Sequence, residues 1–343
     1  MAEPREYRQA ALLFVLMVLI FFWPLFWGRI LSQADMLYSV PPWNSVKPDD
    51  LRGPANTILN DQTREFLTFF HVAKESFHGM EFPLWNPYIM GGTPLLADSQ
   101  SALLFPLNWP FYFLPLFLGF TASALLKMFI ASMGTYALSR RLSLSHLPAV
   151  LSGTAYTFSV FTVFWLNHPH TNATIFLPVL LLLAERIAET PSSLSMGILG
   201  LTVGMQLLGG HVEITFQIAF AVTLFFLFRL VDYRKDGKAL FLRLKVFVGG
   251  YTLGFFLAGA VMVPFLEFLS RSATWQVRSE ENLFILPPTG FFSFFLPDFF
   301  TKVAWPFDMS GCHSLSLYAG ISPLILGILA LALKPGLIPG SPR

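Results

Sequence analysis

The chain has 343 residues, of which 54% are hydrophobic and only 12% are charged, and its mean hydropathy is +0.60. Soluble domains carry roughly 25% charged residues, so this composition excludes an ordinary soluble protein and indicates an integral membrane protein. The net charge is +2 and no Lys/Arg cluster forms a binding stripe, which argues against nucleic acid as a partner. A single cysteine, Cys312, excludes an internal disulfide framework and a cysteine-rich metal site.

A membrane span needs about 20 mostly apolar residues, and eight stretches meet this requirement or nearly so. They cover residues 10–31, 115–138, 146–166, 172–188, 194–209, 214–231, 245–268 and 318–333. The first stretch has no convincing small-residue cleavage site, so we interpret it as a retained helix and not as a signal peptide. We therefore expect an all-α polytopic membrane protein with about eight transmembrane helices.

Lysine and arginine fall mainly on one side when the spans are counted alternately. That side collects Arg5, Arg8, Arg140, Arg141, Arg186, Arg229, Arg234, Lys235, Lys238, Arg243, Lys245 and Lys334. The positive-inside rule makes this side cytoplasmic. We therefore expect a multi-pass protein of the cell inner (plasma) membrane with both termini in the cytoplasm. It would form a single module over residues 1–334, with outer loops 32–114 and 269–317 and a short cytoplasmic tail over 335–343.

Residues 60–108 form a polar region in an otherwise apolar chain. Asp61 opens a segment whose apolar residues recur at helical spacing from Phe66 to Phe77, which predicts an amphipathic helix on the membrane surface. Asp61 would either cap this helix or act as a general base toward an acceptor hydroxyl. The proline- and glycine-rich runs at 83–87 and 91–94 predict a shaped loop, and long loops of this kind are often functional.

Six of the seven histidines fall on the expected outer side or at its rim, which points to a site at that boundary. His168 and His170 lie in one short outer loop, and His211 and Glu213 lie in another. These four side chains could bind a divalent metal. They could equally form hydrogen bonds with lipid phosphate or substrate hydroxyls, because neither loop has a ligand pair at helical i, i+4 spacing.

Two further acids and one lysine have alternative interpretations. Asp35 directly follows the first span and is either a solvated flank or a second candidate base, whereas Asp98 has the sequence context of a turn or cap residue. Lys127 lies near the middle of the second span, where a charge costs about 2.5–3.5 kcal/mol, so we expect it to face protein and find an ion-pair or carbonyl partner. Gly250 and Gly254 are expected to allow close helix packing.

The stretch PLWNPYIMGGTPLLADSQSALLFPLN resembles the first outer loop of the bacterial YfhO-like membrane protein family, which has a PLWNP…GG.P…A..Q…P.N pattern. Other stretches resemble the family too: NHPH, LLGGHVE, GTY…RRL and FLPDFF. That family is similar to glycosyltransferases of the GT-C class, which take a sugar from a polyprenyl-phosphate donor and place it on an acceptor outside the cytoplasm. Its members are usually much longer than this chain.

The resemblance implies a GT-C-like membrane glycosyltransferase that works in the lipid bilayer. Its donor would be a polyprenyl-phosphate sugar, and its acceptor an extracytoplasmic glycan, lipid or protein. The implied base is Asp61, with Asp35 second, although the adjacent acid pair common in the class is absent because Gln62 follows Asp61. The implied substrate-binding residues are Arg64, Lys74, Trp85, Asn86, Tyr88, Gln100, His168, His170, His211 and Glu213.

No cofactor and no metal ligand is assigned, and a divalent metal stays open as an alternative. The alternative function is a non-catalytic membrane protein, either a lipid-linked-saccharide transporter or a truncated inactive relative.

Overall fold

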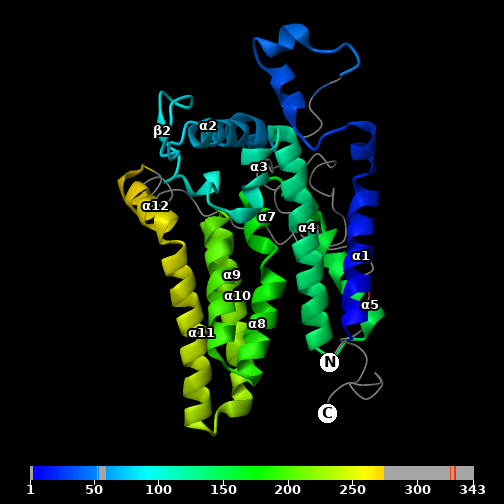
Figure 1. Cartoon of the computed structure of the whole chain (residues 1–343), viewed down its shortest axis with the longest axis vertical. Helices are drawn as coiled ribbons and strands as arrows, with labels where there is room; N and C mark the ends of the chain where they lie inside the picture. The colour runs from blue at the N-terminus through cyan, green and yellow to red at the C-terminus, as the bar shows by residue number, and fades with distance from the viewer. Residues whose placement is uncertain (1–2, 52, 54–58, 274–324, 326–327, 330–343) are drawn as a thin grey trace, which may run out of the picture.

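The long apolar runs form helices that stand side by side in one bundle (Figure 1). The computed structural model describes residues 3–51, 53, 59–273, 325 and 328–329. The helices of the bundle are α1 (Pro4–Phe21), α4 (Leu116–Arg141), α5 (His146–Thr157), α6 (Val160–Phe164), α7 (Pro169–Thr174), α8 (Leu177–Glu189), α9 (Ser193–Leu208), α10 (Val212–Leu230), α11 (Gly237–Leu257) and α12 (Gly259–Arg271).

Four helical stretches of the described chain are long and apolar enough to cross a membrane. They are Leu116–Arg141, Pro169–Glu189, Val212–Tyr233 and Gly237–Leu257, and α9 is apolar but shorter. Helix α10 leaves Phe216 and Phe220 more than half exposed, as expected for side chains that face lipid. Together these helices support the expectation of an all-α membrane protein.

Four of the eight expected spans are not single helices, and the last cannot be compared. In the stretch 10–31, α1 ends at Phe21 and the 3-10 segment Trp23–Trp27 follows, and the stretch 172–188 begins in α7 and continues in α8. The stretch 146–166 divides into α5 and α6, because the Ser159 side chain accepts a hydrogen bond from the Thr162 amide and starts a new helix. The stretch 245–268 divides at Ala258 between α11 and α12, and α12 contains Pro264. The eighth stretch, 318–333, lies outside the described residues except for 325, 328 and 329. The rest of the loop 269–317 beyond residue 273 and the tail 335–343 also lie outside them.

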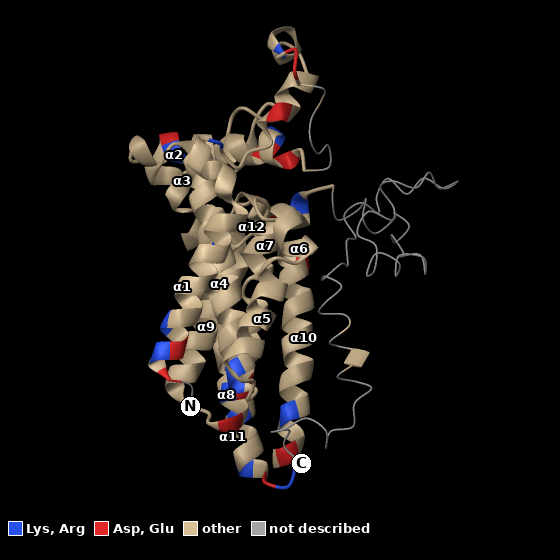
Figure 2. Ribbon diagram, turned by 90° about the vertical axis from the view of Figure 1, so that its right-hand side faces the viewer, with Lys and Arg blue, Asp and Glu red and all other residues tan. Residues whose placement is uncertain are grey.

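The connections between the helices divide between the two ends of the bundle. Residues 142–145, 190–192 and 231–236 lie at the end where α1 begins, and Lys and Arg gather there (Figure 2). The described residues of 22–115 and the turns at 165–168 and 209–211 lie at the opposite end (Figure 1). The helices therefore alternate in direction, and we call the two ends the basic end and the loop end.

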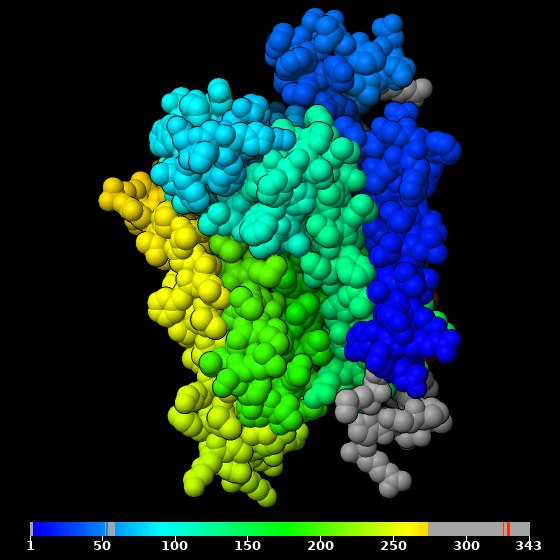
Figure 3. Space-filling view, viewed as in Figure 1, coloured from blue at the N-terminus to red at the C-terminus, as the bar shows by residue number. Residues whose placement is uncertain are grey.

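A layer of short elements covers the loop end (Figure 3). It contains the π-helical turn η4 (Gln62–Phe66), α2 (Leu67–His78), α3 (Pro110–Phe113) and the hairpin of β1 (Trp85–Asn86) and β2 (Thr93–Pro94), and 3-10 segments at Trp23–Trp27, Ala34–Ser39, Trp43–Val46, Ser99–Ser101 and Pro106–Asn108. Helix α2 lies across the bundle axis (Figure 1) and buries Phe69, Phe70, Val72 and Ala73. Phe70 stacks on Phe111 of α3 with ring centroids 3.9 Å apart. These contacts fix the layer on the bundle.

Helices α9 and α11 pack closely through glycines on both partners. A Cβ on Gly254 would lie 2.6 Å from Val203, and a Cβ on Gly200 would lie 2.7 Å from Leu253. The side chains of one helix therefore occupy the space left by the glycines of the other. The expected packing role of Gly250 and Gly254 is confirmed.

Candidate functional site

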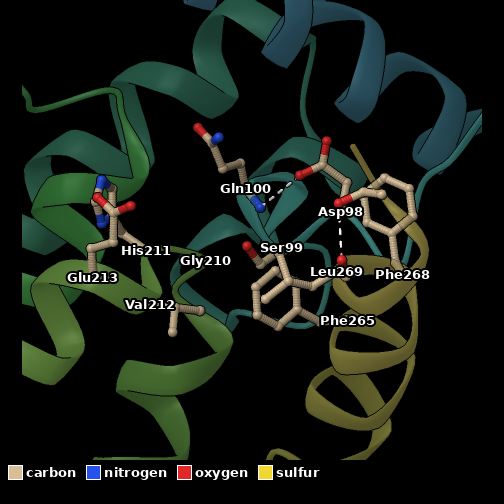
Figure 4. Close-up of a pocket in the computed structure, with 11 residues that line it drawn as sticks. Asp98, Ser99, Gln100, Gly210, His211, Val212, Glu213, Phe265, Phe268 and Leu269 are labelled. Carbon is tan, nitrogen blue, oxygen red and sulfur yellow. Dashed lines mark hydrogen bonds between the residues drawn. The ribbon is translucent and has the colours of Figure 1, made fainter. Parts of the chain in front are cut away.

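A cavity of about 270 Å³ opens at the loop end of the bundle (Figure 4). Three segments that are distant in sequence form its wall: the loop around Asp98, the turn before α10, and α12. Its lining residues are Asp98, Ser99, Gln100, Gly210, His211, Val212, Glu213, Phe265, Phe268, Leu269 and Ser272. Polar groups come from the first two segments, and α12 supplies two phenylalanines (Figure 4).

Besides Glu213, the acid in the lining of this cavity is Asp98. Its Oδ1 accepts a hydrogen bond from the Gln100 amide at 3.0 Å, which starts the 3-10 turn Ser99–Ser101. The expected cap role is therefore confirmed. Burial raises the pKa of Asp98 above its ordinary value, and the hydrogen bond from Gln100 opposes part of this effect. A carboxylate with a raised pKa is a better proton acceptor near neutral pH.

Gly210 allows the Asp98 loop and the turn before α10 to touch. Its φ is +89°, and a Cβ at this position would lie 2.3 Å from the Ser99 carbonyl oxygen. Only glycine fits both the backbone conformation and the space. The turn is also held from α7, because Asn172 Nδ2 donates to the Gly209 carbonyl at 2.8 Å.

The structure brings His168, His170 and His211 together from two loops. The ring centroids of His170 and His211 lie 4.1 Å apart, and those of His168 and His170 lie 6.3 Å apart. Trp165 stacks on His170 at 4.0 Å and holds the cluster from the α6 side. The Nδ1 atom of His211 accepts a hydrogen bond from the Ile214 amide and thereby caps α10.

His168 is buried, and its burial sets which interactions it can make with a substrate. Burial, followed by the charge of Lys127, lowers the pKa of His168 to about 3, so the ring is neutral near pH 7. It can exchange hydrogen bonds with a phosphate but contributes no positive charge. Within the described residues, neither ring nitrogen of His168 has a hydrogen-bond partner, although buried polar atoms normally have one.

Lys127 lies beside this histidine and next to Gln100. Its Nζ donates to the Leu166 carbonyl at 3.4 Å, so a carbonyl partner is present as expected. Lys127, His168 and Gln100 line the same narrow space behind the cavity. The second span therefore directs a buried amine toward the loop end.

Asp61 lies at the start of η4, and its side chain makes no capping hydrogen bond. The side-chain capping alternative for Asp61 is therefore wrong. Burial raises the pKa of Asp61, and the nearby charge of Arg64 opposes this effect. Burial also raises the pKa of Glu65, and the negative charges of Asp61 and Asp98 raise it further. Glu65 therefore lies within electrostatic range of both Asp61 and Asp98.

The segment after Asp61 also reaches the histidines. The Phe66 ring contacts the His168 ring edge-on with centroids 5.3 Å apart. Asp35 lies in the turn Ala34–Ser39, which is linked to the same segment because the Gln33 amide donates to Gln62 Oε1 at 2.7 Å. Neither Asp35 nor Asp61 lines the cavity.

Of the ten expected substrate-binding residues, Gln100, His211 and Glu213 line the cavity. The other seven do not: His168 and His170 lie next to it, and Arg64, Lys74, Trp85, Asn86 and Tyr88 are the remaining five. Lys74 Nζ donates instead to the Leu114 carbonyl at 2.7 Å. Trp85 packs on Gly92, where a Cβ would lie 2.7 Å from its ring, and Asn86 Oδ1 accepts from the Tyr88 amide at 3.0 Å. Trp85, Asn86 and Tyr88 therefore shape the hairpin, and their expected role in substrate binding stays a prediction.

Among the described residues, no group of three or more His, Cys, Asp and Glu side chains has the arrangement of a metal site. The divalent-metal alternative therefore has no ligand set in this part of the chain. Comparison with known proteins adds no relative: no family model, curated protein or solved structure matches the chain.

Sequence reasoning missed three parts of the site. Asp98 was predicted only as a turn or cap residue, Glu65 was not singled out, and α12 was not expected to contribute Phe265 and Phe268. The Asp98-Ser99-Gln100 stretch lies inside the loop motif, so its position beside Gln100 was the available signal for Asp98. No sequence pattern indicated the contribution of α12.

Proposed function

We propose that the chain is a GT-C-like glycosyltransferase module that moves a sugar from a polyprenyl-phosphate donor to an acceptor at the loop end. The observation that carries the proposal is the meeting of Asp98, Gln100 and His211 at one cavity, with His168 and His170 next to it. A carboxylate, an amide and several imidazoles at the end of an apolar bundle suit a substrate that has a sugar, a phosphate and a lipid chain.

The proposed base is Asp98, because it is the aspartate that lines the cavity. Its carboxylate takes the proton of the acceptor hydroxyl, whose oxygen then bonds to the anomeric carbon as the bond from that carbon to the phosphate oxygen breaks. The configuration inverts, and the polyprenyl phosphate leaves with the bonding electron pair. Glu65 acts on this step through its electrostatic interaction with Asp98, and Asp61 acts indirectly through its interaction with Glu65.

Groups beside the cavity suit the leaving phosphate. His168 and His170 offer ring nitrogens, and the Lys127 amine supplies N–H donors behind Gln100. Hydrogen-bond donors and cations placed where negative charge develops stabilise a transition state. Phe265 and Phe268 of α12 give the cavity an apolar side that fits a sugar face or the first part of the lipid chain.

The proposal also assigns sides of the membrane. The basic end would be cytoplasmic under the positive-inside rule, and the cavity would face the outside of an inner membrane. The N-terminus would then be cytoplasmic. This orientation places the reaction on the side where cell-envelope acceptors are found. The likeness to the YfhO-like family in the loop motif agrees with this assignment and remains a proposal.

The test separates the enzyme from the non-catalytic alternative. The purified chain in liposomes is given a labelled polyprenyl-phosphate sugar and an envelope extract as the acceptor source. The proposal predicts labelled acceptor and released polyprenyl phosphate from the wild type, with both lost in Asp98→Asn. Movement of intact donor across the liposome without transfer would favour a transporter. Neither transfer nor movement, with a full-length relative active in the same assay, would favour a truncated inactive protein.

A further inference from the structure

A second and larger cavity lies at the basic end, far from the candidate active site. Its volume is about 670 Å³, within the range of small-molecule sites. It lies between α1, α4 and α8, and its lining residues are Tyr7, Ala137, Arg140, Arg141, Ser143, Leu182, Leu183, Arg186 and Thr190. Three arginines therefore surround one space in the region where basic residues gather (Figure 2).

The arginines are only partly neutralised. Arg140 pairs with Glu6 at 2.6 Å and Arg141 pairs with Glu189. Arg186 is exposed and forms no ion pair with any described residue. Three guanidinium groups facing two carboxylates leave one excess positive charge at the cavity.

Arg140 has an unused donor as well. Its Nη1 donates to the Leu144 carbonyl and its Nη2 to Glu6, but its Nε is buried without a partner among the described residues. A buried N–H without an acceptor is costly. An oxygen-rich anion in the cavity is the kind of ligand that supplies such an acceptor, and guanidinium groups match phosphate oxygens in pairs.

The remaining lining suggests the source of the phosphate. Ala137, Leu182 and Leu183 give the cavity an apolar wall, while Tyr7, Ser143 and Thr190 add hydroxyls. A free inorganic phosphate has no apolar part that could pack on this wall. A phospholipid has a headgroup that can bind the arginines and acyl chains that can pack on the leucines. Basic pockets between membrane helices on the cytoplasmic side bind anionic lipid headgroups in this way.

We propose that this cavity binds the phosphate of an anionic phospholipid, held chiefly by Arg186 and Arg141. The site is separate from the proposed sugar-transfer site and does not depend on it. Glu189 weakens the site because it neutralises Arg141. Removing the Glu189 charge should therefore raise the affinity for the lipid, and removing the charge of a lining arginine should lower it.

The test is lipid affinity measured by native mass spectrometry on the purified full chain, with phosphatidylglycerol and the zwitterionic phosphatidylcholine as probes. Arg186→Gln is expected to weaken phosphatidylglycerol binding about fivefold, the effect of one arginine near a lipid charge. Glu189→Gln is expected to strengthen it. Arg234→Gln is the matched control, because Arg234 is exposed at the same end but does not line the cavity.

Four outcomes would overturn the proposal. The first is that phosphatidylglycerol fails to bind, and the second is that phosphatidylcholine binds equally well. The third is that Arg234→Gln and Arg186→Gln weaken binding to the same extent, which would indicate general attraction of the lipid to the basic surface. The fourth is that inorganic phosphate alone stabilises the protein as much as phosphatidylglycerol does, with the same dependence on Arg186. Free phosphate would then be the ligand.

Discussion

Asp98 shows how one carboxylate can have a structural and a chemical role at the same time. One oxygen caps the turn Ser99–Ser101 through the Gln100 amide, while the group lines the cavity. The cap fixes the direction of the side chain, and burial raises its pKa. Sequence alone predicted the cap, because it is local. It could not predict the cavity, because the α10 turn and α12 come from more than a hundred residues further along the chain.

The raised pKa of Asp98 predicts a pH-dependent stability difference. A carboxyl whose folded pKa lies above its unfolded value stabilises the fold most below the unfolded pKa, near 3.8, and this contribution is lost as pH rises through the folded pKa. An asparagine at this position does not ionise, so Asp98→Asn does not lose stability in this way as pH rises. The melting temperature of the variant, relative to wild type, should therefore rise with pH across this window when both are scanned in detergent.

Asp232→Asn is the control for this pH series, since Asp232 is exposed at the basic end. Its difference from wild type should not follow the same course. A pH-independent difference between Asp98→Asn and wild type would contradict the assigned burial of the carboxyl.

Gly210→Ala tests the contact between the Asp98 loop and the α10 turn. The added Cβ meets the Ser99 carbonyl oxygen and also requires a left-handed backbone for a residue with a side chain. We expect loss of sugar transfer and destabilisation of more than the roughly 1 kcal/mol that such a backbone costs alone. Gly91→Ala is the matched control, with φ +75° but open space around it. Equal effects of the two substitutions would exclude the close approach as the cause.

At the scale of elements, hydropathy located the helices but not their interruptions. The windows 146–166 and 245–268 are apolar on average, so a 20-residue average cannot detect the local cap at Ser159 or the break at Ala258. The amphipathic helix after Asp61 was predicted from the spacing of its apolar residues, and α2 does bury its apolar face. The π-helical turn after Asp61 and the failure of Asp61 to cap have no comparable pattern in the sequence.

The packing of α9 on α11 gives an element-scale prediction. Gly254→Ala places a Cβ 2.6 Å from Val203 and 2.9 Å from the Gly200 carbonyl oxygen. We expect a loss of about 1–3 kcal/mol, typical of overpacking, measured as a lower unfolding midpoint in denaturing detergent. Gly197→Ala on α9 is the control, because nothing lies within 4 Å of the added Cβ. That change should be neutral or stabilising by up to about 1 kcal/mol. A tolerated Gly254→Ala would contradict the close packing.

At the scale of the whole molecule, the separation of charge between two ends is the feature that the sequence predicted best. Counting spans placed the basic connections on one side, and the described helices place 142–145, 190–192 and 231–236 at one end. The prediction succeeds because alternation depends on the number of passes and not on their exact bounds. The orientation in the membrane follows only from the positive-inside rule.

Single cysteines test that orientation. In a Cys312→Ser background, Glu213→Cys places a thiol beside the candidate site and Lys235→Cys places one at the basic end; both positions are exposed. An impermeant thiol reagent applied to intact cells should label Glu213→Cys, and should label Lys235→Cys only after the membrane is opened. The reverse pattern would invert the orientation and move the cavity to the cytoplasmic side.

The central claim is that the loop-end cavity carries out sugar transfer with Asp98 as the base. The most direct measurement is the rate of transfer from a polyprenyl-phosphate sugar by wild type, Asp98→Asn, Asp61→Asn and Asp35→Asn, with Asp232→Asn as the control. Loss of a general base costs about 10²–10⁴-fold. We predict a loss of this size in Asp98→Asn, a smaller loss in Asp61→Asn, and wild-type rates in Asp35→Asn and Asp232→Asn. Wild-type transfer by Asp98→Asn would contradict the account.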